Sequence, residues 1–387
     1  MEAKGIVVVG AAGSPARAML AALSRAVDLE GLTAVDLYWS PEARAEVEAL
    51  GVEAVSGDVL SDTGQRLLER RPAVSLLVNM AGPFYVIGTG ALELAIELGA
   101  DYLDICDDVD ATELLLALEP QARGQGIRAL IGMGSAPGTT NILIRTALDA
   151  LEDPRRSAVE LAWTVDRADM TRAAFDHVIH CFATALPGVS EVPEWDDLQP
   201  RYLVFPEPGG RQVIMTLGHP EPLTLPRFTG VGQVTNQGGI SPPEYLHLCW
   251  ALARQCDLRT LQREGVDAAL YQQYCSFEQL PQVEQVRYGS GLQIDVTIDG
   301  DGYRFAGGSD MKMEEATGVP AAAGVLLMLG GALAEPGVWA PECLKPPAFF
   351  EALRRVALGG GGLHLLLLRD GQPAGRARIR DLLATGA

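Results

Sequence analysis

The chain has 387 residues, enough for two or three domains with a well-buried core. Hydrophobic residues make up 48% and charged residues 21%, which is the composition of a folded protein and not of a disordered one. The 50 acidic residues outnumber the 30 Lys and Arg, so the formal net charge is −20. Such a charge opposes nucleic-acid phosphates and anionic lipid, and we expect neither nucleic acid nor membrane as a partner.

The cysteines and the apolar segments bear on location. Six cysteines are scattered without a C-x-x-C pair, which predicts reduced thiols, a cytoplasmic protein and no structural metal site. The longest apolar stretch, residues 319–333, is shorter than the ~20 residues that a membrane-spanning helix needs, so we interpret it as a buried helix. The first residues, which reach the short apolar run 6–9 at once, are not typical of a signal peptide.

Short apolar runs alternate with helical patterns over the first 135 residues. The runs predict strands at 6–9, 34–39, 52–55, 75–79, 102–106 and 128–131. Helices are predicted between them, at roughly 15–28, 41–50, 61–70, 88–99 and 110–125. This β-α alternation predicts an α/β domain with a parallel, doubly wound sheet.

After Pro137-Gly138 the alternation stops, and longer strand candidates follow at 159–165, 212–217 and 292–298. We interpret this part as a second, α+β domain. Helices are then predicted at 311–333 and 347–358, with a short strand at 363–368. The predicted domains are therefore 1–138, 139–315 and a C-terminal segment, 316–387.

The first predicted strand ends in a glycine turn, and a helix follows at once. Gly10 suits the backbone angles of such a turn, and Gly13 lets main-chain N–H groups approach a pyrophosphate at the helix N-terminus. Pro15 fits the first helical turn. The candidate cofactor-binding residues here are Gly10, Ala12, Gly13, Ser14 and Pro15. A tight turn without a ligand is the alternative.

The end of the second predicted strand bears on the kind of cofactor. NAD sites usually place an acid there, whereas NADP sites place a hydroxyl and an arginine. With the strand ending at residue 39, Ser40 and Arg44 favour NADP, and NAD stays possible because Asp36 would serve if the strand ended earlier. Arg44 could instead be an ordinary exposed helix residue. Asp58, after the third strand, is a further cofactor candidate.

The positions of lysine exclude one class of nicotinamide enzyme. Short-chain dehydrogenases use Tyr-x-x-x-Lys, but Gly308 and Pro341 stand four residues before Lys312 and Lys345, and the third lysine is Lys4.

A series of motifs resembles the saccharopine dehydrogenase-like family. The motifs are the segments 78–84, 99–104, 134–141 and 218–227, followed by Thr317-Gly318-Val319-Pro320. The resemblance implies a Rossmann domain, an inserted domain that binds substrate and commonly builds a homodimer, and a C-terminal segment that returns to the first domain. It also implies hydride exchange between a nicotinamide cofactor and an amine or imine.

The resemblance implies site residues as well. After the fourth strand, on the nicotinamide side, it places Asn79, Ala81, Gly82, Pro83 and Phe84. Small residues at the carboxyl end of a strand also let the backbone approach a ligand closely, although a simple turn is the alternative.

Acidic residues follow the fifth strand, where the sequence departs from the family pattern. Asp104 precedes Ile105-Cys106-Asp107-Asp108, so Asp107 is a candidate for substrate binding. We predict that Asp104 and His180 exchange protons with the substrate. A helix N-terminus rich in acids and a structural histidine are the alternatives.

Asn141 and Arg227 complete the predicted substrate-binding residues, because an arginine suits the carboxylate of an amino acid. His219 could contact the substrate or hold a loop in place. His177 and His180 are three residues apart, but the sequence offers no nearby third ligand for a metal site. The predicted function is an NAD(P)-dependent oxidoreductase acting on a C–N bond of an amino-acid-like or polyamine-like small molecule. A carbonyl or enoyl reductase and a non-catalytic NADP-binding sensor are the alternatives.

Overall fold

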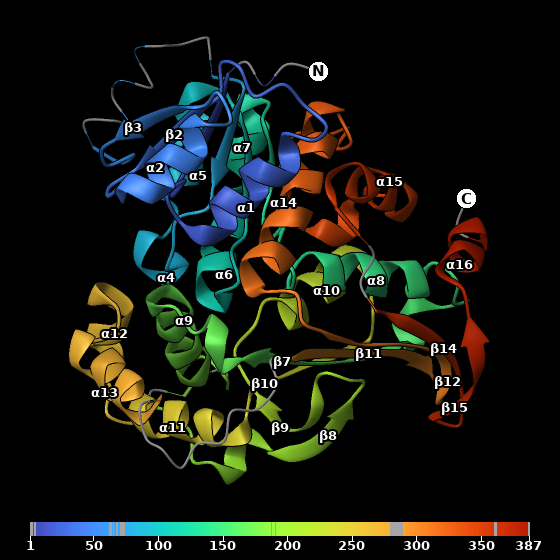
Figure 1. Ribbon diagram of the computed structural model, residues 1–387. Helices are drawn as coiled ribbons and strands as arrows, with labels where there is room; N and C mark the ends of the chain where they lie inside the picture. Colours follow the sequence, from blue (N-terminus) through green and yellow to red (C-terminus); the bar gives the residue numbers. More distant parts are fainter. Residues whose placement is uncertain are drawn as a thin grey trace. The chain divides into compact units, whose positions relative to one another are not determined.

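The computed structural model describes residues 3, 5–61, 64, 66, 69, 74–186, 188–189, 191–278, 289–359 and 362–385. The chain forms two compact units (Figure 1). The first unit comprises Met1–Ile142 and Met313–Gly360, and the second comprises Leu143–Lys312 and Gly361–Ala387. The predicted C-terminal segment is thus divided: its two predicted helices lie in the first unit, and residues 361–387 belong to the second.

The first unit contains a seven-stranded parallel sheet in the order β13-β6-β5-β4-β1-β2-β3. The predicted doubly wound α/β fold is therefore confirmed. The sheet gains a strand that the sequence did not predict, β13, which comes from the C-terminal part and pairs with β6. The strands are β1 Ile6–Val9, β2 Thr33–Asp36, β3 Glu53–Ser56, β4 Leu76–Asn79, β5 Asp101–Asp104, β6 Arg128–Leu130 and β13 Gly337–Trp339.

In the first sheet two strands, β2 and β5, end three and two residues earlier than predicted, and in both an aspartate carboxylate explains the end. The predicted strand 34–39 stops at Asp36, whose Oδ1 accepts from Tyr38 N and whose Oδ2 accepts from Ala12 N. The predicted strand 102–106 stops at Asp104, whose Oδ1 accepts from Cys106 N. These side chains compete with the sheet for main-chain donors and turn the chain.

Helices of the first unit follow the strands, and α1 packs against α14. The apolar residues 319–333 largely fall in α14 and are mostly buried, as predicted. The predicted helix at 61–70 lies largely outside the described residues. The helices are α1 Ser14–Leu23, α2 Pro41–Glu48, α4 Phe84–Ile87, α5 Gly90–Leu98, α6 Val109–Ala117, α7 Glu119–Gln125, α14 Met313–Leu329, η4 Pro341–Cys343 and α15 Pro346–Val356, and α8 Thr139–Leu148 crosses the boundary between the units. Among the residues described, no helix has the length and apolar character needed to cross a membrane.

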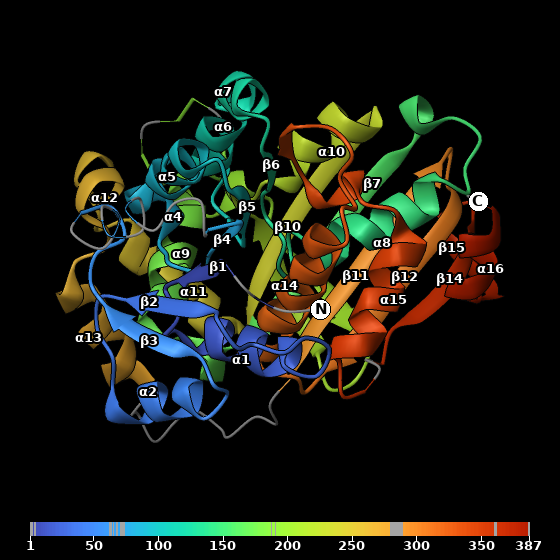
Figure 2. The same cartoon turned by 90° about the horizontal axis from the view of Figure 1, so that it is seen from above.

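The second unit contains a mixed eight-stranded sheet in the order β15-β14-β12-β11-β7-β10-β9-β8. Figure 2 shows β10, β7, β11 and β12 side by side, and only β7 with β10 is a parallel pair. The strands are β7 Ala158–Asp166, β8 Arg201–Phe205, β9 Gly210–Thr216, β10 Gln233–Ser241, β11 Ser290–Ile298, β12 Asp301–Ser309, β14 His364–Arg369 and β15 Gln372–Ala377. Its helices are η1 Pro154–Arg156, η2 Arg167–Asp169, α9 Arg172–Ala183, η3 Asp196–Leu198, α10 Glu221–Thr229, α11 Pro243–Ala253, α12 Leu258–Glu264, α13 Ala268–Glu278 and α16 Ile379–Thr385.

Candidate functional site

The turn between β1 and α1 is built for a close approach of the backbone. Gly10 has φ +73°, and a Cβ there would lie 2.5 Å from Ala81 N in the loop after β4. Only glycine fits that conformation and that space. Gly13 is the N-cap of α1, and Pro15 lies in the first turn. No side chain caps this helix, so the N–H groups of Ser14 and Ala16 in its first turn can serve an anion.

Asp36 places a carboxylate beside this turn. It is the last residue of β2, the strand next to β1, and its Oδ2 accepts from Ala12 N at 2.9 Å. The side chain is half-buried, so part of it stays accessible. The acid that the sequence analysis kept as an alternative therefore occupies the position at which NAD-binding folds hold the adenosine ribose.

The residues predicted to bind the 2′-phosphate of NADP make other contacts. Ser40 is the N-cap of α2, and its Oγ accepts from Ala43 N at 3.1 Å. Arg44 donates to Ala54 O at 3.0 Å and to Ser56 Oγ at 2.9 Å. Asp58 is exposed, and its Oδ1 accepts from Leu60 N.

The predicted nicotinamide-side residues follow β4 as expected from the sequence. Asn79 is buried; its Oδ1 accepts from Ala81 N at 3.1 Å, and its Nδ2 donates to the Tyr102 hydroxyl at 3.3 Å. Gly82 is exposed, and Ala81 and Pro83 are half-buried. Phe84 begins α4 and is buried. Asn79 thus shapes a turn whose accessible residues are small.

Asp104 is fully buried and joins two loops. Its Oδ1 accepts from Cys106 N at 3.0 Å and from Gly132 N, in the loop after β6, at 2.7 Å. Burial raises the pKa of Asp104 to about 6, and hydrogen bonds from the N–H groups of Gly132 and Cys106 and from the Tyr102 hydroxyl limit that rise. Burial also raises the pKa of the neighbouring Cys106 thiol well above its usual range, so this cysteine is not an activated nucleophile.

The other predicted residues of the first unit differ in exposure. Asp107 is half-buried, whereas Asp108 is buried at the N-terminus of α6 and accepts from Tyr85 N. Asn141 is fully buried; its Oδ1 accepts from Gly138 N, and its Nδ2 donates to Glu342 Oε2 at 2.9 Å. Both ends of the Asn141 amide are thus used inside the unit, which fixes the start of α8.

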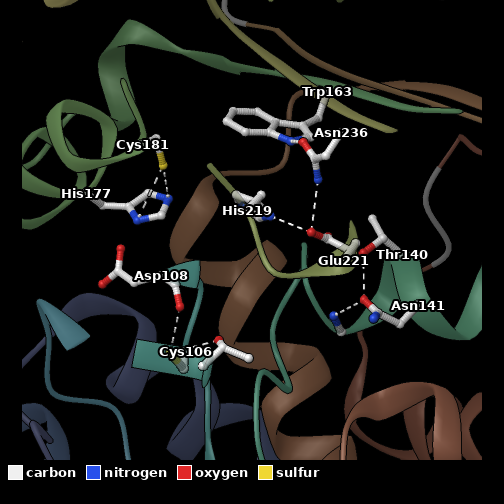
Figure 3. A network of polar contacts seen from close by, with 12 residues as sticks. Cys106, Asp108, Thr140, Asn141, Trp163, His177, Cys181, His219, Glu221 and Asn236 are labelled. Carbon is white, nitrogen blue, oxygen red and sulfur yellow. Dashed lines mark hydrogen bonds and ion pairs between the residues drawn. The ribbon is translucent and has the colours of Figure 1, made fainter. Parts of the chain in front are cut away.

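In the second unit, His180 is buried on α9, and Arg227 is exposed on α10 with its guanidinium over the Phe228 ring. The sequence carries no signal for the partners of His219. His219 Nδ1 lies 2.6 Å from Glu221 Oε2, which also accepts from Asn236 Nδ2 at 2.9 Å (Figure 3). Trp163 Nε1 donates to Asn236 Oδ1 at 2.9 Å. The G-H-P-E motif at 218–221 contains the first two of these residues, but not their partners.

The first unit is thus a doubly wound α/β fold with a glycine turn beside a carboxylate, and the mixed-sheet unit carries a buried histidine–glutamate pair. No protein-family model matches the chain, and no curated protein matches it. Solved structures do. Apo saccharopine dehydrogenase (L-Glu forming) from Saccharomyces cerevisiae is 15% identical with a TM-score of 0.63, over 95% of this chain and 100% of that chain.

Homospermidine synthase from Legionella pneumophila, in complex with NAD, is 12% identical with a TM-score of 0.59, over 94% of this chain and 91% of that chain. The chain therefore has the fold of saccharopine dehydrogenase. The resemblance inferred from the motifs is confirmed at the level of the fold.

Proposed function

We propose that the protein is an NAD(H)-dependent oxidoreductase of the saccharopine dehydrogenase-like family that interconverts an amine with an imine or carbonyl. The substrate class is amino-acid-like or polyamine-like, in keeping with the two proteins that share the fold. The observation that carries the proposal is the pair formed by the Gly10 turn and the Asp36 carboxylate at the carboxyl ends of β1 and β2.

The residues present fit a nicotinamide dinucleotide. The backbone from Gly10 to Ser14 would hold the pyrophosphate, and Asp36 would accept from the ribose hydroxyls. We propose NAD over the NADP predicted from the sequence, because a 2′-phosphate would meet the Asp36 carboxylate. Arg44 and Ser40, its predicted partners, already hold the backbone and the start of α2. When bound, the cofactor supplies a hydride acceptor or donor.

The chain's own residues would position the substrate. Ala81, Gly82 and Pro83 line the turn after β4, and Asp104 would act by holding the loops that follow β5 and β6. Asp107 and Arg227, both accessible, stay candidates for the substrate ammonium and carboxylate. A homodimer through the second unit is part of the proposal.

Cofactor binding and turnover test the proposal together. Titration of the protein with NADH and NADPH, followed by cofactor fluorescence, should give tighter binding of NADH. Asp36→Ser should weaken NADH ~10-fold or more, the effect of losing hydrogen bonds to a charged group. Asp28→Ser is the matched control, since this exposed aspartate also accepts from the N–H two residues on, and it should leave NADH binding unchanged. Equal losses in both variants would contradict the assignment.

Saccharopine, lysine, ornithine and putrescine should then be assayed with NAD⁺ at alkaline pH by the absorbance of NADH. Oxidation of one of these amines is the expected result. If the protein binds NADH tightly, oxidises none of these amines and reduces carbonyl or enoyl compounds, it is a carbonyl or enoyl reductase. Binding without turnover of either kind would favour a sensor.

A further inference from the structure

A cavity of about 290 Å³ lies within the second unit, between the hairpin of β8 and β9 and the face of the sheet (Figure 1). The register of β9 with β10 covers two residue pairs, and the hairpin then lies across the sheet. Phe205, the last residue of β8, packs on Gly291 of β11, where a Cβ would lie 2.4 Å from its ring. An apolar cluster fills this end of the hairpin; its members are Ala162, Leu203, Phe205 and Ile214. The cavity is at the other end, where β8 begins at Arg201.

Polar side chains from three strands and one loop line this cavity. They include Glu160 on β7, Arg201 on β8, Gln233, Thr235 and Gln237 on β10, and Gln199 in the loop before β8. None of the described residues that line it is aromatic. Gln199 has φ +54° and ψ +54°, a left-handed conformation that is uncommon for a residue with a Cβ and that occurs often at ligand sites.

Arg201 and Glu160 bring opposite charges to the cavity without using up their hydrogen-bonding capacity. Arg201 Nε donates to Gln237 Oε1 at 2.6 Å, which fixes the guanidinium. One of its outer nitrogens lies 4.0 Å from Glu160 Oε2, too far for a hydrogen bond. Within the part of the chain that the structure describes, the outer nitrogens of Arg201 donate no hydrogen bond and the Glu160 carboxylate accepts none. The two side chains are 43% and 65% exposed, so a ligand can reach both.

The other charges near Glu160 are already paired. Asp295 on β11 stands opposite Glu160 in the register of β7 and β11. Arg304 on β12 donates to both carboxylate oxygens of Asp295, each at 2.6 Å. Because a two-bonded pair of this kind is strong and an exposed pair at 4.0 Å contributes little, a ligand can separate Arg201 from Glu160 at low cost.

We propose that this cavity binds a free α-amino acid of zero net charge whose side chain is polar. The outer N–H groups of Arg201 take the carboxylate, and the Glu160 carboxylate takes the ammonium group. A polyamine would leave Arg201 without a partner, and a dicarboxylate would meet the charge of Glu160. An α-amino acid carries both charges on one carbon, as a cation and an anion 4.0 Å apart require.

The rest of the lining selects the side chain and the size of the ligand. The three glutamines both donate and accept hydrogen bonds, which suits an amide or a hydroxyl group. A volume of about 290 Å³ is at the lower end for ligand pockets, so the cavity suits a molecule as small as an amino acid. This site uses residues of the second unit alone and goes beyond the proposed oxidoreductase activity, which assigns it no role.

Calorimetric titration of the full-length protein with L-glutamine, without nicotinamide cofactor, tests the site. Wild type should bind L-glutamine with a Kd of about 1 mM or tighter, as expected for a ligand of this size. Arg201→Gln and Glu160→Gln should each weaken binding ~10-fold or more, because each removes hydrogen bonds between charged groups.

Two variants that do not line the cavity are the matched controls. Arg211→Gln removes an exposed arginine of the same hairpin, whose guanidinium lies over the Tyr202 ring at 4.0 Å. Glu207→Gln removes an exposed acid from the turn between β8 and β9. Both should bind L-glutamine as wild type does, and circular dichroism should show that all four variants are folded.

Ligands that lack one charge assign each contact to its residue. 4-Carbamoylbutanoate is L-glutamine without the ammonium group, and 4-aminobutanamide is L-glutamine without the carboxylate. Followed by saturation-transfer NMR, each should bind wild type at least ~10-fold more weakly than L-glutamine. Arg201→Gln should further weaken 4-carbamoylbutanoate but not 4-aminobutanamide, and Glu160→Gln should do the reverse. L-Leucine should bind more weakly than L-glutamine, because its side chain leaves the glutamines without partners.

Each outcome decides for or against the site. If wild type does not bind L-glutamine, or if folded Arg201→Gln and Glu160→Gln bind it as tightly as wild type, the cavity is not an amino-acid site. Equal losses in Arg211→Gln or Glu207→Gln would mean that net charge, and not the cavity, governs binding. If L-leucine binds as tightly as L-glutamine, the selection of a polar side chain is wrong. Since no measurement here involves a nicotinamide cofactor or turnover, these results leave the proposed function untouched.

Discussion

Asp104→Asn should change how the stability of the protein depends on pH. The buried carboxyl group of Asp104 has a pKa of about 6 instead of its ordinary 3.8, chiefly because burial disfavours the charged form. The native state thus holds this proton more tightly than the unfolded chain does. Asp104 therefore costs no stability well below pH 3.8, and its cost grows as the pH rises until the group is ionised in both states, above pH 6.

The size of the effect follows from the two pKa values. Their difference, at about 1.4 kcal/mol for each pKa unit, amounts to about 3 kcal/mol at pH 8. Roughly half of this cost is present at pH 5 already, so about 1.5 kcal/mol develops between pH 5 and pH 8. The asparagine of the variant cannot ionise, but its Oδ1 can still accept from the N–H groups of Gly132 and Cys106.

Urea unfolding of both proteins at pH 5, 6, 7 and 8 measures the difference. The unfolding free energy of Asp104→Asn minus that of wild type should increase by about 1.5 kcal/mol from pH 5 to pH 8, so the variant gains stability relative to wild type. The amide NH₂ that replaces Oδ2 can change the stability of the variant by the same amount at every pH. Such a constant change cancels when the stability differences at two pH values are compared. Asp58→Asn, at an exposed position, controls for the change in net charge. Parallel pH profiles for wild type and Asp104→Asn would refute the reasoning.

Other predictions concern the two glycines and the assembly. Gly10→Ala should lower the unfolding free energy by clearly more than Gly51→Ala, which has a similar φ but nothing within 4 Å of its Cβ and should cost about 1 kcal/mol; equal melting temperatures would contradict the close approach of Ala81. Gly238→Ala should be destabilising in the wild-type background and much less so combined with Trp163→Ala; additive losses in urea unfolding would mean that the indole is not what requires the glycine. Light scattering should give twice 41.1 kDa at micromolar concentration, and a monomer would refute the proposed homodimer.

Local patterns in the sequence were sufficient for the architecture of the first unit. Buried parallel strands have continuous apolar runs, and glycine turns leave a direct trace in the residues, so β1, its turn and the β-α alternation could be predicted. The order of the motifs indicated the fold that the solved structures share. The end of β2 could not be read in this way. Leu37, Tyr38 and Trp39 continue a strand-like pattern, whereas the structure ends the strand through the bond from Asp36 to Ala12 N, 24 residues earlier.

Contacts between distant residues decided the rest. The first sheet takes its seventh strand, β13, from residues more than 200 positions after β6, and the short sequence Gly337–Trp339 has no pattern that marks it as a strand. His219 was visible in its motif, but the network around it also takes in Asn236 and Trp163, which lies 73 positions before Asn236. A hydrogen-bond network takes its direction from whichever groups the fold places next to one another, and the spacing of residues along the chain does not specify those neighbours.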